Sequence, residues 1–132
     1  MAQKSETQLQ PKTYTFDAAG KTLGRLSARV ALILQDKNTP AFLYHQKRSK
    51  KVVIYHTDDI RVTGVNKPTQ KIYYRHSGFP GGIKGISLKH QMEKDSTVVM
   101  RKAIKGMLPK NKLQKRLMAS ITLYKGELPI SK

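Results

Sequence analysis

The chain has 132 residues, of which 26 are lysine or arginine and 8 are aspartate or glutamate, so its formal net charge at pH 7 is +18. This length suits one domain and is too short for a substrate domain joined to a cofactor domain. The absence of cysteine excludes disulfides, thiolate metal sites and cysteine nucleophiles. Apolar residues make up 38% of the chain, which allows a modest core, whereas the unbalanced charge requires an anionic partner.

Residues 1–11 are mostly polar and end at Pro11, which is typical of a disordered tail. This segment lacks the apolar region of a secretory signal, and no apolar run approaches the ~18 residues that would span a bilayer. We therefore expect a soluble protein that works in the compartment where it is made. The rest of the chain shows no repeat and no clear linker, so we expect one domain over residues 12–126 and a short tail over residues 127–132.

The first part of the domain predicts a strand, a helix and a second, parallel strand. Residues 14–16 favour a strand, residues 17–20 favour a turn, and the apolar positions of residues 23–34 recur at helical spacing. A basic loop at residues 47–51 then leads into residues 52–55, an almost wholly apolar run that is typical of a strand covered on both faces. Such a unit has a right-handed crossover.

The middle of the domain is dominated by glycine and proline. Residues 60–63 predict a short strand, and residues 64–86 predict a long irregular excursion with one extended piece at residues 71–75. Such a stretch is uncommon in a compact domain unless it is functional. Because its glycine-rich backbone also carries several cations, we interpret it as suited to a close approach to phosphates.

The last third predicts mainly helices. One covers residues 87–94, and a second runs from a cap at Ser96 to a stop at Gly106 and Pro109. A further helix at residues 111–117 and a last strand at residues 121–124 complete the domain. We expect the second helix to face the core with an apolar stripe, made of Val99, Met100, Ala103, Ile104 and Met107.

Two motifs suggest nucleotide binding and fail on inspection. Gly20-Lys21-Thr22 matches the end of a phosphate-binding loop, but the glycine needed five residues earlier is replaced by Thr15, inside a predicted strand. We therefore expect no nucleotide hydrolysis, although the positive end of the following helix, with Lys21, can still meet an RNA phosphate. The glycines of residues 81–85 fail the dinucleotide pattern because Pro80 stands at its first position.

No catalytic or metal-binding group is predicted. The four histidines are scattered and have no cysteine to complete a zinc set. Asp58 and Asp59 are better explained by a turn than by paired catalytic carboxylates, because successive side chains of an extended segment point to opposite faces. We therefore expect no enzyme activity, no metal and no cofactor.

Basic clustering is the strongest functional signal. Residues 101–116 carry seven cations and no acid, whereas an ordinary solvated helix interleaves glutamate with lysine. A charge of one sign favours a nucleic-acid interface. Tyr74, beside Lys71 and Arg75, adds possible base stacking, although a tyrosine pair in a strand more often places one ring in the core. The candidate contacts with RNA are Lys21, Arg25, Arg29, Lys47, Arg48, Lys50, Lys51, Lys67, Lys71, Tyr74, Arg75, His76, Lys84, Arg101, Lys102, Lys105, Lys110, Lys112, Lys115 and Arg116.

Four segments resemble one known family in the family's own order. They are FDAAGKTLGRLS at residues 16–27, VTG at 62–64, YYRHSGFPGG at 73–82 and AIKGMLPK at 103–110. Over about residues 13–126 the chain resembles the bacterial form of the family of large-subunit ribosomal protein thirteen. The resemblance implies a single three-layer α/β/α domain with a four-stranded, mostly parallel sheet, to which glycine-rich and basic loops add RNA contacts. Residues 41–51 depart from the family pattern.

The resemblance also implies a function. A member of this family would be a structural constituent of the large ribosomal subunit in the cytoplasm, without a membrane or a small-molecule substrate. It would bind rRNA and neighbouring ribosomal proteins and support early assembly of the subunit. The alternative is an RNA-binding translational repressor that acts on its own mRNA. Sedimentation separates the two hypotheses, since a subunit protein stays with the particle through a high-salt wash.

Overall fold

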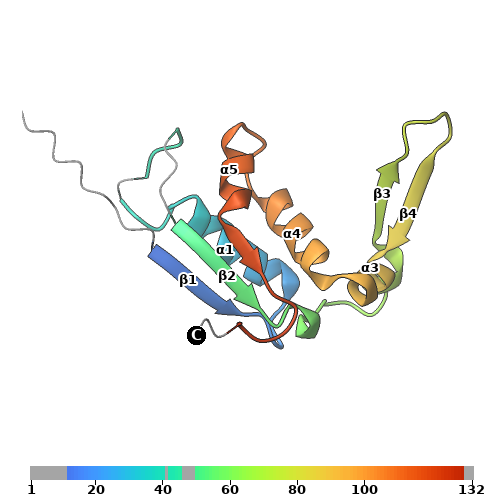
Figure 1. Ribbon diagram of the computed structural model, residues 1–132, viewed down its shortest axis with the longest axis horizontal. Helices are drawn as coiled ribbons and strands as arrows, with labels where there is room; N and C mark the ends of the chain where they lie inside the picture. Colours follow the sequence, from blue (N-terminus) through green and yellow to red (C-terminus); the bar gives the residue numbers. More distant parts are fainter. Residues whose placement is uncertain (1–11, 41, 46–49, 130–132) are drawn as a thin grey trace, which may run out of the picture.

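The structure, a computed structural model, describes residues 12–40, 42–45 and 50–129. Figure 1 shows a body of strands and helices from which a two-stranded hairpin projects. The predicted tail at residues 1–11 and residues 130–132 of the predicted tail at residues 127–132 lie outside the described residues. The expected domain boundaries therefore stay a prediction.

Three parallel strands form the sheet of the body, in the order β1 (Lys12–Asp17), β2 (Lys50–Tyr55) and β5 (Ile121–Leu123). Because successive side chains of a strand point to opposite faces, β2 buries Val52 and Ile54 completely. Val53 and Tyr55, on the other face, stay half-buried. The strand is therefore buried on one face only, whereas its apolar run had predicted burial on both faces.

Two long helices pack against each other, and the first of them lies against the central strand of the sheet (Figure 1). α1 (Leu23–Leu34) buries Leu26, Val30 and Leu34, and α4 (Ser96–Met107) buries Val99, Met100 and Ile104. This helical spacing confirms both predicted amphipathic helices. Met107 differs from the prediction, because its side chain is 41% exposed at the end of the apolar stripe.

The residue that caps α4 differs from the prediction. The Asp95 carboxylate, and not Ser96, caps the helix, since it accepts a hydrogen bond from the Thr97 N–H at 3.0 Å and from the Thr97 hydroxyl at 2.7 Å. The Thr97 hydroxyl is the main reason why the pKa of Asp95 is lowered. Ser96 is buried instead and hydrogen-bonds to Thr57 at 2.8 Å, which ties α4 to the turn after β2.

The short strand predicted at residues 60–63 is reduced to a bridge. Arg61 pairs with Thr22 in a parallel bridge. The Arg61 N–H donates to the Lys21 carbonyl, and the Leu23 N–H donates to the Arg61 carbonyl, both at 2.9 Å. The pairing ends there because α1 begins at Leu23 and the chain stops being extended. In the described part of the chain, the sheet thus has three strands, with helices packed on one face, rather than four strands in three layers.

The glycine-rich middle is more ordered than the sequence predicts. After α2 (Lys67–Gln70), β3 (Ile72–His76) pairs antiparallel with β4 (Ile83–Ser87) and forms the projecting hairpin at the right of Figure 1. β4 falls mostly within residues 64–86, which were expected to be mainly irregular because of their many glycines and prolines. A Cβ on Gly85 would lie 2.9 Å from Cγ2 of Ile72 and 3.3 Å from the Tyr74 ring, so this glycine lets the strand pair closely.

The C-terminal elements follow the prediction closely. α3 (Leu88–Lys94) begins after Ser87, whose hydroxyl accepts a hydrogen bond from the His90 N–H at 3.4 Å. α5 (Leu113–Ala119) begins slightly later than expected, after Asn111 accepts a hydrogen bond from the Gln114 N–H at 3.1 Å. β5 then returns the chain to the sheet beside β2.

Candidate nucleic-acid interface

The outer face of α4 carries the first group of predicted contacts. Arg101, Lys102 and Lys105 are exposed, whereas Met100 and Ile104, next to them in the sequence, are completely buried. The helix therefore separates charge from packing as the sequence predicts, and its cations are free to meet an anion. Lys110, Lys112, Lys115 and Arg116 are exposed on the segment that follows.

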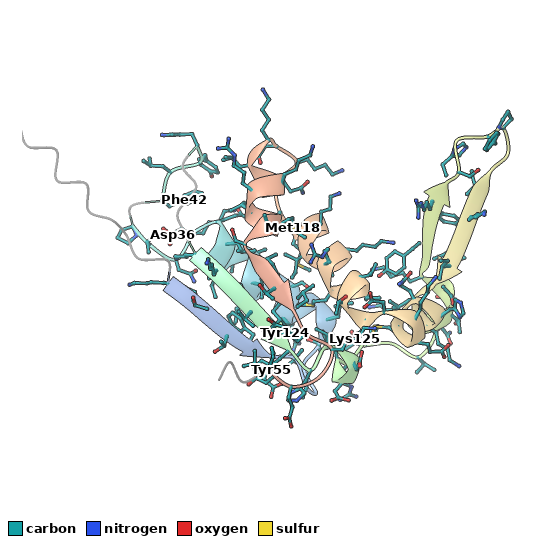
Figure 2. The ribbon with its side chains drawn as sticks, viewed as in Figure 1. Asp36, Phe42, Tyr55, Met118, Tyr124 and Lys125 are labelled. Atoms are coloured by element: carbon teal, nitrogen blue, oxygen red, sulfur yellow. The ribbon has the colours of Figure 1, made fainter. Side chains whose placement is uncertain are left out.

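A groove between α4 and α5 brings part of this charge together. Arg101, Lys105 and Lys115 line it, and Met118 lies between the two helices (Figure 2). Gln114 fixes the arrangement, because its side-chain N–H group donates to the carbonyls of Lys105 at 2.9 Å and Leu108 at 3.3 Å. These bonds satisfy carbonyls at the end of α4, which have no partner within the helix. Gln114 was not predicted as a functional residue, and its contribution depends on this tertiary contact.

The start of α1 forms a second basic hollow. Lys21, Arg25 and Arg29 line it, together with Gly20 and Thr22. Gly20 turns the chain at φ +66°, and the preceding Asp17 accepts a hydrogen bond from the Ala19 N–H at 3.0 Å, which lowers the pKa of this carboxyl group. Thr22 makes no side-chain capping bond, and the first turn of α1 has no acid. The positive helix end therefore adds to the three cations.

The same turn excludes a phosphate-binding loop of the nucleotide-hydrolase type. Thr15, at the place where that motif needs its first glycine, lies within β1 and is paired in register with Val53 of β2. A residue held in the sheet cannot contribute to a loop that wraps a phosphate. The strand prediction for this position is confirmed.

A third basic hollow, which we call the α1–α4 groove, lies between the start of α1, the end of α4 and the segment before β3. Lys67, Lys71 and Lys102 line it, and no acidic residue does. The Lys102 ammonium also lies 4.3 Å from the centre of the Tyr73 ring and the Lys71 ammonium lies 5.7 Å from it. Burial raises the pKa of Tyr73, so its phenol stays neutral and the ring holds both lysines by cation–π attraction.

The hairpin presents aromatic and cationic side chains together. Tyr74 is 70% exposed and Phe79 at the tip is 74% exposed. Arg75, His76 and Lys84 are exposed beside them, and no acid occurs between Asp59 and Glu93. Exposed aromatic rings beside cations are the combination on which unpaired bases stack. Phe79 was not among the predicted contacts, because the sequence around it indicates only a glycine-rich loop.

The ring of His76 helps to shape the hairpin tip. Its Nδ1 accepts a hydrogen bond from the Gly78 N–H at 2.9 Å. Because Nδ1 accepts this bond, Nε2 is the ring nitrogen that is left to donate to a partner. An N–H donor at this place can bond a phosphate or base oxygen.

Two of the predicted contacts do not join these surfaces. Lys50 is only 12% exposed because it forms an ion pair with Asp36, at the end of α1, so we leave it out of the interface. Lys51 is exposed on the opposite face of the sheet from the helices. Lys47 and Arg48 lie outside the described residues.

The described residues offer little else of functional chemistry. In residues 12–40, 42–45 and 50–129, no cluster of three or more histidine, aspartate or glutamate side chains is placed to hold a metal ion. Among the helices of these ranges, none is long and apolar enough to cross a bilayer. Basic, aromatic-edged surfaces are therefore the feature that the fold displays.

Comparison with known proteins decides the family. The family model described as ribosomal protein L13 matches residues 11–129. The chain belongs to this family. Curated relatives named large ribosomal subunit protein uL13 include one from Roseiflexus sp. (strain RS-1), 41% identical over 95% of this chain and 84% of its own length. Those of Azotobacter vinelandii (strain DJ / ATCC BAA-1303), 44% identical over 86% and 79%, and Macrococcus caseolyticus (strain JCSC5402), 43% identical over 92% and 83%, are similar.

The L13 family match covers every basic surface described above. It spans β1 to β5, including the hairpin and the α1–α4 groove. The resemblance seen in four short segments is therefore confirmed over nearly the whole described chain. The family is a structural, non-enzymatic component of the ribosome, in agreement with the expected absence of enzyme activity.

Proposed function

We propose that this protein is a structural constituent of the large ribosomal subunit, where it binds rRNA through its basic surfaces. Membership of the ribosomal protein L13 family is the observation that carries the proposal. The sorting of side chains on α4 supports it, because Arg101, Lys102 and Lys105 face outward over a buried apolar stripe. The protein acts in the cytoplasm, as part of the ribosome.

The basic surfaces bind rRNA in two ways, through phosphate contacts and through base stacking. The cations of α1, α4 and α5 contact phosphates, which supply affinity without reading sequence. On the hairpin, Tyr74 and Phe79 stack on unpaired bases, and Arg75 and Lys84 hold the adjoining phosphates. Because these surfaces lie on several sides of the protein, it holds separate rRNA segments together, and this bridging supports early subunit assembly.

Neighbouring ribosomal proteins are further partners of the same particle. The half-buried face of the sheet, with Val53, Tyr55 and Lys51, lies away from the helices and carries less charge than the α4 side. We assign protein contacts to such weakly charged parts of the surface and rRNA contacts to the basic ones.

The test is sedimentation of tagged protein from cells that express it. A structural constituent is found with large subunits at about one copy per particle and stays there through a high-salt wash. The matched variant carries Arg101→Glu, Lys102→Glu and Lys105→Glu, which reverse one exposed face and leave the core intact. This variant should be found free. A parent protein found mainly off the ribosome, bound to its own mRNA, would support a translational repressor instead.

A further inference from the structure

The α1–α4 groove is walled by two helices that each present a glycine to it. Gly24 lies in the first turn of α1, and Gly106 lies in the last turn of α4. Gly106 was expected to end its helix, yet α4 continues through it to Met107. Both glycines are exposed. Glycine is a poor residue inside a helix, because it costs more conformational entropy than alanine.

Nothing within the described protein requires glycine at these two positions. Neither residue has a positive φ, so the backbone would accept any L-amino acid. A Cβ added to Gly24 or to Gly106 would meet nothing within 4 Å. The glycines that the fold does need behave differently, since a Cβ on Gly82 would lie 2.0 Å from the Ser77 hydroxyl oxygen. We therefore look for the reason for Gly24 and Gly106 outside the described part of the chain.

The rest of the groove indicates what approaches them. Lys67, Lys71 and Lys102 supply positive charge, and the lining has no acid to balance it. Its floor is apolar, with Leu23 from α1 and the 41% exposed Met107 from α4. Lysines over an apolar floor match the chemistry of a nucleic-acid strand, which has anionic phosphates and an apolar sugar face. An acidic protein segment would satisfy the lysines, but its side chains would not need bare helix backbone on both walls.

We propose that one strand of rRNA lies in the α1–α4 groove with its sugar–phosphate backbone directly against the helix backbones at Gly24 and Gly106. Lys67, Lys71 and Lys102 bind its phosphates. The absence of a Cβ on either wall lets the ribose come closer than any other residue would allow. This inference rests on the proposed function, since it names the part of the interface where rRNA approaches most closely.

The experiment adds bulk to the groove without removing charge. Gly24→Gln and Gly106→Gln place a neutral, helix-favouring side chain on each wall, and Gly24→Ala with Gly106→Ala adds only the two Cβ atoms. Gly126→Gln is the control, because Gly126 is also exposed, has no positive φ and has open space around its missing Cβ, but does not line the groove. Each protein is melted thermally and titrated against deproteinised bacterial large-subunit rRNA.

We expect both glutamine variants to melt at or above the parent temperature and to bind rRNA at least tenfold more weakly. The alanine double variant should also melt no lower than the parent and bind several-fold more weakly, and Gly126→Gln should bind like the parent. The inference is overturned, with the proposed function intact, if the parent binds rRNA and both glutamine variants bind within twofold of it. Normal binding to naked rRNA with failed incorporation into subunits would assign the groove to a protein and also overturn it. A parent that does not bind rRNA would overturn the proposed function as well.

Discussion

Arg75 on β3 lies directly opposite Lys84 on β4, so the hairpin holds two exposed cations in one cross-strand pair. Like charges placed opposite each other destabilise a pair of strands by up to about 1 kcal/mol. No acid lies between residues 60 and 92 to relieve this repulsion. The arrangement is understandable if an anion covers both side chains, as rRNA would.

Reversing one of these charges should separate folding from binding. We expect Lys84→Glu to melt at the parent temperature or slightly above it, because an opposite-charge pair replaces the repulsive one. The same variant should bind rRNA roughly tenfold more weakly, since one phosphate contact is lost and a repulsive charge is introduced. Lys89→Glu, an equal charge change on exposed α3, is the control. If both variants lose the same affinity, the hairpin makes no special contact.

Binding to rRNA should depend steeply on salt. The basic surfaces described here can engage five or more phosphates, for which the slope of log affinity against log salt is about −3.5 or steeper. Affinity should then fall roughly a hundredfold between about 50 and 200 mM salt. Filter binding of the purified protein to large-subunit rRNA measures this slope. A change of less than about threefold over that range would contradict a phosphate-dominated interface.

Substitutions on the two faces of α4 should have different effects, one on stability and the other on incorporation into subunits. Ile104 is completely buried, so Ile104→Ala should destabilise the protein by about 2–5 kcal/mol and lower its melting temperature markedly. Lys105 and Lys112 are exposed, so the double change Lys105→Glu with Lys112→Glu should shift stability by under ~0.5 kcal/mol per site yet impair incorporation into subunits. Thermal melts and subunit reconstitution distinguish the outcomes. Normal assembly of the double variant would remove this face from the interface.

Asp95 should stabilise the protein only above acidic pH. Asp95→Ala removes the cap of α4 and should cost about 0.5–2 kcal/mol near neutral pH. The folded pKa of Asp95 lies below its usual value of 3.8, so its stabilisation is fully present above that value and is lost as pH falls through the folded pKa. The difference in melting temperature between parent and variant should therefore shrink in acid. A difference that stays constant from neutral to strongly acidic pH would show that the carboxylate charge does not contribute.

The sequence alone determined what local periodicity and composition can encode. The helical spacing of apolar residues placed α1 and α4 and separated the buried Ile104 from the exposed Lys105, because a helix sorts its own faces. The one-signed charge of residues 101–116 identified the kind of partner. These features depend on residues a few positions apart, so no tertiary contact was needed to find them.

Tertiary structure decided everything that depends on distant neighbours. β4 was missed because a glycine inside a short segment argues against a strand. The advantage of Gly85, which has no Cβ to clash with Ile72 and Tyr74, is visible only when these residues lie beside it across the hairpin. Lys50 looked like a surface cation until Asp36, fourteen residues earlier, was seen to pair with it. Gly106 looked like a helix stop, whereas the fold keeps it helical and sets it with Gly24 on one groove. Burial and pairing of such side chains arise from which elements meet, and short-range sequence patterns do not contain that information.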